Sequence, residues 1–106
     1  MDKVVAAAEF AAINDYWSPR VVGELNGQLV KFVRLKGEFE WHKHTAEDEM
    51  FWVLSGELTI RLRDRDVVLG PNEFFIIPRG VEHMPVCPEE CRIMLFEPAA
   101  TKQKGD

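Results

Sequence analysis

Three histidines and one glutamate form the pattern in this sequence that is best suited to chemistry. His42 and His44 stand two residues apart, and Glu49 follows five residues after His44. The third histidine, His83, comes shortly after residues 78–80, a Pro-Arg-Gly turn. Residues two apart in a β-strand point to the same face, which would place the first two imidazoles side by side. Nitrogen and oxygen donors of this kind suit a divalent Fe, Mn, Ni, Cu or Zn ion, so these four residues are candidate ligands of one metal.

The simpler alternative is that the histidines are ordinary surface or core residues, as a lone histidine usually is. A His-X-His pair is by itself a weak signal, but here it is combined with a spaced glutamate and with a Pro-X-Gly-X-X-His block. That combination favours the metal site. Calcium is excluded as the ion, because no acidic spacing matches a calcium loop and histidine is a poor ligand for it.

Several nearby residues leave two alternatives open. Glu40 has the same parity as His42, so an unbroken strand would point it inward as a base or further ligand, whereas a bulge would turn it outward. Cys87 and Cys91 are either free thiols of a reducing compartment or, for Cys87, a sulfur close to the metal. The arginines at positions 61 and 79 would either meet an anionic substrate or be solvated.

The elements that must position these residues are expected to be short strands. Asn26-Gly27 predicts a tight hairpin between strands 21–25 and 28–35, because both central residues of a type I′ turn need positive φ. Further strands are expected at about 38–44, 49–54, 57–63, 66–69, 74–77, 82–86 and 92–96. Residues 3–13 are rich in alanine and predict a short helix. So many short strands indicate an all-β sandwich or barrel.

Length, charge and composition limit the classes of function. A chain of 106 residues has room for one domain, and we expect an N-terminal helical or extended segment (1–19), a barrel (20–98) and a flexible tail (99–106). The formal net charge of -5 argues against binding nucleic acid. The early apolar run over residues 4–8 is too short for a signal peptide or a membrane span, so we expect a cytoplasmic protein without a membrane partner.

The same residues resemble the two motifs of the cupin superfamily. The first motif is matched by Gly37, His42, His44, Glu49 and Gly56, with one residue fewer than usual after the first glycine. The second motif is matched by Gly70, Pro78, Gly80 and His83, with two extra residues after Gly70 and Cys87 in the place of the usual asparagine. The resemblance implies a double-stranded β-helix, or jelly-roll, barrel in which the three histidines and Glu49 bind the metal. The chain looks most similar to small single-domain cupins of the mannose-6-phosphate isomerase-like group.

Two functions follow from this resemblance. The first is a metal-dependent enzyme, such as an isomerase or dioxygenase, that acts on a small polar molecule such as a sugar phosphate or keto acid, with Glu40 as the candidate catalytic base. The second is a module that binds or senses a metal or small ligand without turnover, because a fold alone does not specify a reaction. Cupins commonly form dimers, so a twofold homodimer is expected, with residues 30–35 or the N-terminal segment at its interface.

Overall fold

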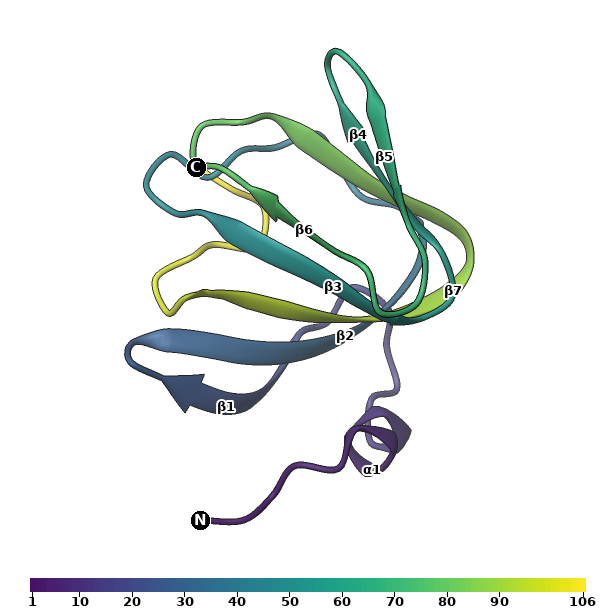
Figure 1. Ribbon diagram of the computed structural model, residues 1–106, viewed down its shortest axis with the longest axis vertical. Coiled ribbons are helices and arrows are strands. Elements are labelled where there is room, and N and C mark those ends of the chain that lie inside the picture. Colours follow the sequence, from purple (N-terminus) through teal and green to yellow (C-terminus); the bar gives the residue numbers. More distant parts are fainter.

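The computed structural model describes residues 1–106 and consists mainly of antiparallel strands wrapped around one core (Figure 1). A short helix precedes all of the strands, as expected. The elements in chain order are α1 (Ala6–Ala11), β1 (Arg20–Leu25), β2 (Gln28–Glu38), β3 (Glu49–Ser55), β4 (Leu58–Leu62), β5 (Asp66–Leu69), β6 (Phe74–Ile77) and β7 (His83–Pro98). The predicted all-β fold with an N-terminal helix is therefore confirmed, and α1 is not long and apolar enough to cross a membrane.

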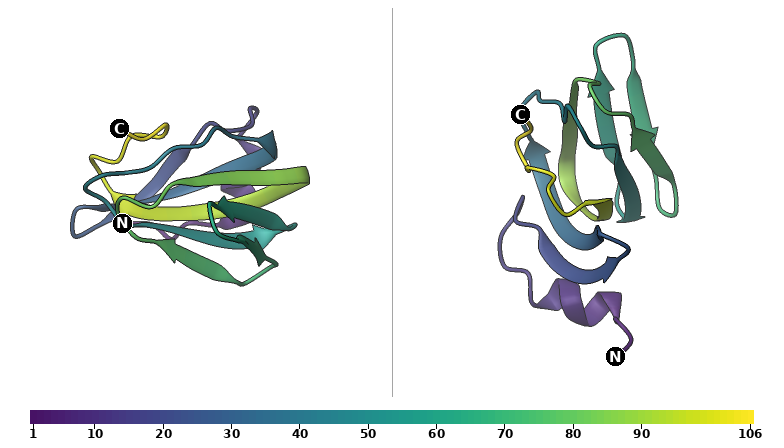
Figure 2. Two further views of the ribbon diagram at one scale, coloured as in Figure 1. Left: turned by 90° about the horizontal axis from the view of Figure 1, so that it is seen from above. Right: turned by 90° about the vertical axis from the view of Figure 1, so that its left-hand side faces the viewer.

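The longest strand, β7, holds the barrel together. The sheet order is β1-β2-β7-β3-β6, and β4 pairs with both β5 and β7. The C-terminal part of β7 lies between β2 and β3, whereas its first residues pair with β4. Two views at right angles show β7 curving between these partners, with the β4–β5 hairpin standing apart from β1 and β2 (Figure 2). Since β7 takes part in both sets of pairs, it joins the β4–β5 hairpin to the other strands.

The structure differs from the sequence prediction in two places, which involve three expected strands. The expected strands at 82–86 and 92–96 are one element, β7, whose pairing with β2 shifts register between Leu35 and Gly37. The expected strand at 38–44 is absent, because β2 ends at Glu38 and only an isolated bridge between His42 and His83 follows. Residues 39–48 thus form a connection that is held by few backbone pairs.

The first hairpin agrees with its prediction. Asn26 and Gly27 have φ values of 52° and 82°, and Leu25 pairs directly with Gln28. These positive values are those that a type I′ turn requires, and Asn-Gly tolerates them better than other pairs.

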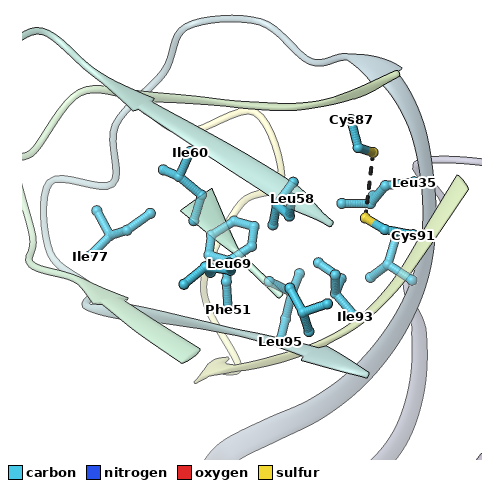
Figure 3. Packing of buried hydrophobic residues seen from close by; sticks show 12 residues of the cluster. Leu35, Phe51, Leu58, Ile60, Leu69, Ile77, Cys87, Cys91, Ile93 and Leu95 are labelled. Atoms are coloured by element: carbon cyan, nitrogen blue, oxygen red, sulfur yellow. Dashed lines mark hydrogen bonds between the residues drawn. The ribbon is translucent and has the colours of Figure 1, made fainter. Parts of the chain in front are cut away.

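Alternating side chains fill the interior of the barrel. Leu58 and Ile60 of β4 are fully buried, as their alternation with polar residues predicts, and the buried Ile93 and Leu95 alternate with half-buried residues along β7. Figure 3 shows these side chains meeting across the core. The core cluster consists of Val33, Leu35, Phe51, Val53, Leu58, Ile60, Leu69, Ile77, Cys87, Cys91, Ile93 and Leu95. A separate small cluster lies outside the sheet, where Phe10 stacks on Phe32 with ring centroids 4.9 Å apart and fixes the N-terminal segment.

Candidate metal centre

The four candidate ligands come from three parts of the chain and converge at one place. His42 and His44 lie in the connection after β2, Glu49 is the first residue of β3, and His83 is the first residue of β7. The backbones of His42 and His83 exchange two hydrogen bonds, with N···O distances of 3.1 and 2.9 Å. One ligand atom from each of the four side chains lies within 4.8 Å of the other three.

The spacing of the ligand atoms fits a shared ion. Oε1 of Glu49 lies 3.4 Å from Nε2 of His44 and 3.3 Å from Nε2 of His83. Two donors that each sit about 2.1 Å from one ion, at an octahedral or tetrahedral angle, are about 3.0 to 3.4 Å apart. The observed distances are therefore those expected around a transition-metal ion.

Buried polar atoms without partners point to the same conclusion. The side chains of His44, Glu49 and His83 are almost completely buried, with 2, 4 and 0 % of their surface exposed. Nε2 of both histidines and Oε1 of Glu49 make no hydrogen bond. Buried polar groups in folded proteins nearly always have a partner, so three neighbouring exceptions that face one another suit a bound cation.

Backbone carbonyls orient two of the imidazoles. Nδ1 of His42 donates a hydrogen bond to the carbonyl oxygen of Glu40, and Nδ1 of His83 donates one to that of Val81, each at 2.9 Å. A proton on Nδ1 leaves the lone pair of Nε2 free, and Nε2 is the atom that faces the centre. This arrangement is typical of histidines that bind metals.

Charge and burial give the ligands different pKa values. Burial alone would raise the pKa of Glu49, but the neighbouring side chains of His44, His83 and Glu97 outweigh burial and lower the pKa to about 2. Burial lowers the pKa of His42, whereas the close carboxylate of Glu49 overcomes burial at His44 and raises its pKa. Glu49 is thus an anion at neutral pH, as a metal ligand must be.

A second carboxyl group, Glu97, lies beside Glu49 and was not among the sequence candidates. It is 2 % exposed, and Nζ of Lys31 lies 3.7 Å from its Oε2. Burial raises the pKa of Glu97 to about 8, and the neighbouring charge of Glu49 acts in the same direction. Its signal in the sequence is parity, since Glu97 continues the inward series of Ile93 and Leu95 on β7.

A cavity of about 40 Å³ connects the candidate centre with this second carboxyl group. A space of that size holds only a few water molecules. Its polar lining residues are Lys31, His42, Glu49, Glu97 and Gln103. The remaining wall is largely apolar and comprises Trp17, Pro19, Val33, Leu35, Phe39, Phe51, Pro85, Ile93 and Leu95.

Glu40 points away from this cavity. Its side chain is 57 % exposed, and Oε1 lies 3.6 Å from Nζ of Lys104. Of the two orientations left open by the sequence, the structure has the outward one. Strand parity cannot place Glu40, because β2 ends at Glu38 and both Phe39 and His42 line the cavity, which requires a change of parity between them.

The remaining polar candidates lie outside the group of four. Arg79 is exposed, and its Nε pairs with Asp48 at 3.3 Å. Cys87 and Cys91 are fully buried free thiols in the core, with their sulfur atoms 3.4 Å apart (Figure 3). The hydrogen bond that Cys91 donates lowers the pKa of Cys87, and the same bond, together with burial, raises that of Cys91.

Comparison with known proteins agrees with this geometry. The family model described as the cupin domain matches residues 31–97, which is more than half of the chain. The chain belongs to the cupin family. A crystal structure of a cupin-2 domain containing protein from Shewanella frigidimarina is 44 % identical, with a TM-score of 0.88 over 90 % of this chain and 93 % of that one.

Two further relatives extend the likeness of this cupin. The structure of protein NMB1881 from Neisseria meningitidis has a TM-score of 0.84 and 24 % identity, over 92 % of this chain and all of that chain, and it supports the fold alone. Protein YdbB of Bacillus subtilis is 40 % identical over 63 residues. That match spans 58 % of this cupin and about half of the relative, 56 % of its length.

Proposed function

We propose that this cupin binds one divalent transition-metal ion through His42, His44, Glu49 and His83 and uses it to act on a small polar molecule. The observation that carries the proposal is the set of three buried ligand atoms without hydrogen-bond partners, on His44, Glu49 and His83. The chemistry of the donors, three imidazoles and one carboxylate, suits Fe, Mn, Ni, Cu or Zn. A bound ion of this type supplies Lewis acidity for a carbonyl or hydroxyl oxygen.

The cavity suggests what kind of molecule would be bound. Its volume of about 40 Å³ favours a molecule with few heavy atoms, and its walls are largely apolar. Glu97, with a pKa of about 8, is mostly protonated at neutral pH and can donate a hydrogen bond, while Lys31 offers a positive charge. A small keto acid or a similar carboxylate meets these groups better than a sugar phosphate does.

The metal and the reaction can be tested in one series. Elemental analysis of the purified protein should find about one equivalent of a transition metal in the wild type and much less in His44→Ala. Small keto acids should then be assayed for turnover and oxygen uptake. Sugar-phosphate isomerisation, which the mannose-6-phosphate isomerase-like group suggests, is the parallel assay. A wild-type protein that takes up no transition metal would disprove the proposal.

A non-catalytic binding or sensing module is the second candidate. The outward position of Glu40 supports it, because the acid-base candidate from the sequence does not reach the cavity. Glu97→Gln distinguishes the two functions, since it removes the one ionisable carboxyl group in the cavity that is not a candidate ligand. An enzyme that uses Glu97 would lose turnover while keeping its metal. A binding module would show no turnover even in the wild type.

We also propose that two copies form a twofold dimer. Residues 30–35 of β2, one interface expected from the sequence, have β1 on one side and β7 on the other, so their edges are not free. The edge strand β6 carries apolar side chains that are more exposed than those of residues 30–35. Phe74 is 52 % exposed and Ile76 is 51 % exposed, and the ring of Phe74 stacks on that of Trp52.

Light scattering coupled to gel filtration tests this dimer. Phe74→Ser combined with Ile76→Thr should halve the measured mass. Val21→Thr is the control, because it changes an apolar residue of similar exposure, 55 %, on β1. A wild-type monomer would contradict the proposal.

A further inference from the structure

The segment that carries two of the candidate ligands has a strand partner for only part of its backbone. Residues 39–48 include no strand, and His42 makes a single bridge with His83. On the same side of the segment, the amide of Gly80 donates to the carbonyl oxygen of His44 at 2.8 Å. These contacts leave the backbone of Lys43 and the amide of Thr45 to find partners elsewhere.

The C-terminal residues provide those partners. The amide of Asp106 donates to the carbonyl oxygen of Lys43 at 3.1 Å, and the amide of Thr45 donates to Oδ1 of Asp106 at 2.8 Å. The first bond falls between His42 and His44, and the second follows His44 directly. The yellow C-terminal segment lies beside the connection between β2 and β3 in Figure 1 and in the right-hand view of Figure 2.

Gly105 is what allows this close approach. Its φ is +79°, and its amide closes a turn on the carbonyl oxygen of Lys102 at 3.0 Å. A Cβ placed on Gly105 would collide with the carbonyl oxygen of Lys43 and would lie 3.1 Å from the carbonyl carbon and the nitrogen of that residue. A residue with a side chain cannot fill this position unless the segment moves.

Other contacts fix the C-terminal segment along its length. Thr101 is buried, and Nε2 of Gln103 donates to the carbonyl oxygen of Trp17 at 2.6 Å. Nζ of Lys104 lies 3.6 Å from Oε1 of Glu40. Gln103 and Trp17 both line the cavity, so the C-terminal segment also forms part of the cavity wall. These residues are polar in sequence, yet they make defined contacts with Trp17 and with the connection over residues 39–48.

We propose that residues 101–106 act as a clasp that positions His42 and His44 for the metal, with Gly105 and Asp106 as its positioning residues. The proposal rests on the metal site proposed above. Neither residue supplies a ligand. Each acts through the backbone of residues 43 and 45, taking the place of the strand neighbour that this segment lacks. Groups that orient metal ligands from outside typically contribute about 10- to 100-fold to affinity.

Matched variants test the clasp with Co²⁺ as the probe. Gly105→Ala should weaken Co²⁺ binding about 10- to 100-fold, measured by competition with a chelator, and should change the visible absorption of the bound ion. Gly27→Ala is the control, because Gly27 has a similar φ of +82° but an added Cβ would meet nothing within 4 Å. Both variants carry the strain of positive φ, and only Gly105→Ala disturbs Lys43.

A second pair of variants tests the clasp even if Gly105→Ala does not fold. Asp106→Ala should weaken Co²⁺ binding, whereas Asp106→Asn, which keeps the Oδ1 acceptor for Thr45, should restore it to within a few-fold of the wild type. Equal Co²⁺ affinity and absorption in Gly105→Ala, Gly27→Ala, Asp106→Ala and the wild type would overturn the clasp.

Hydrogen exchange in the metal-free protein separates this inference from the metal site itself. The amide of Thr45 should exchange faster in Asp106→Ala than in the wild type and in Asp106→Asn. If the wild type binds no Co²⁺, the metal site fails, and the exchange of Thr45 still decides whether the clasp holds the segment. Unchanged exchange would overturn the clasp even if the metal binds.

Discussion

Burial removes water from the side chains of His44, Glu49 and His83, and each of them retains an atom without a hydrogen-bond partner. Leaving one such group unsatisfied costs about 1 to 3 kcal/mol, so three together would destabilise the metal-free barrel appreciably. A bound cation would satisfy all three at once.

At the residue scale, we expect His83→Ala to lower the affinity for Co²⁺ or Zn²⁺ by more than about 100-fold, because a lost ligand costs more than a lost orienting group. Isothermal titration calorimetry measures the change. Glu57→Gln, a substitution of an exposed residue of the same barrel, is the control and should bind as the wild type does. Equal affinity in His83→Ala and Glu57→Gln would remove His83 from the site.

Glu97 should support Glu49 through a hydrogen bond between the two side chains. Glu97→Gln keeps a donor beside Glu49 and should bind metal within a few-fold of the wild type. Glu97→Ala removes the donor and should lose about 10-fold. Chelator competition on the two variants distinguishes this role from general packing, since a packing role would give the two substitutions similar effects on affinity.

At the level of the strands, the side chain of Glu90 on β7 is hydrogen-bonded to Arg34 on β2, close to the point where the pairing of β7 with β2 shifts register. Its Oε1 accepts a hydrogen bond from Nη2 of Arg34 at 2.6 Å and one from the hydroxyl of Tyr16 at 3.0 Å. Its Oε2 accepts one from Nε of Arg92 at 3.2 Å. The hydrogen bond from Arg34 is the main reason that the pKa of Glu90 falls to about 2.

This pKa gives a pH-dependent contribution to stability. A carboxyl group with a lower pKa in the folded state stabilises the fold above its unfolded pKa of 4.5, and this contribution is lost as the pH falls toward about 2. The free energy of unfolding of the wild type should therefore exceed that of Glu90→Gln at pH 7, and the difference should shrink between pH 4.5 and 2. Urea unfolding with a chelator present measures it. A difference that stays constant over this range would contradict the prediction.

The turn between β3 and β4 packs so closely against β7 that there is no space for a side chain at Gly56. Gly56 has a φ of +84°, and an added Cβ would lie 2.7 Å from Cβ of Cys91 and 2.8 Å from the carbonyl oxygen of Glu90. We expect Gly56→Ala to destabilise the fold by about 1 to 3 kcal/mol more than Gly27→Ala, which has the strain of positive φ without the collision. Chemical unfolding of the two variants tests this, and equal losses would show that β7 moves aside freely.

At the scale of the whole molecule, metal binding and folding should be linked. The ligand His83 is far in the chain from the ligands between residues 42 and 49, so the unfolded chain does not offer the same site. Free Zn²⁺ at 100 times its dissociation constant should add about 2.7 kcal/mol to the free energy of unfolding. Thermal unfolding with and without chelator measures the effect, and His83→Ala should show little of it. A wild-type melting temperature that does not respond to the ion would argue against the site.

Much of this protein could be predicted from its amino-acid sequence. The hairpin at Asn26-Gly27 and the burial of Leu58 and Ile60 follow from patterns of a few residues. Such patterns are informative because turn geometry and strand alternation act between near neighbours in the chain. The convergence of the histidines with Glu49 is expected from the two cupin motifs and not from strand alternation, since the strand expected at 38–44 is absent.

Which carboxyl groups face the cavity depends on the folded structure and could not be predicted from the sequence. Parity fails for Glu40 because its strand ends first, and parity would have found Glu97 only if the strand expected at 92–96 had been extended to Pro98. The contact between Asp106 and the ligand segment joins residues about sixty positions apart. No local pattern encodes it, because it depends on the folded barrel, which brings Asp106 beside His42 and His44.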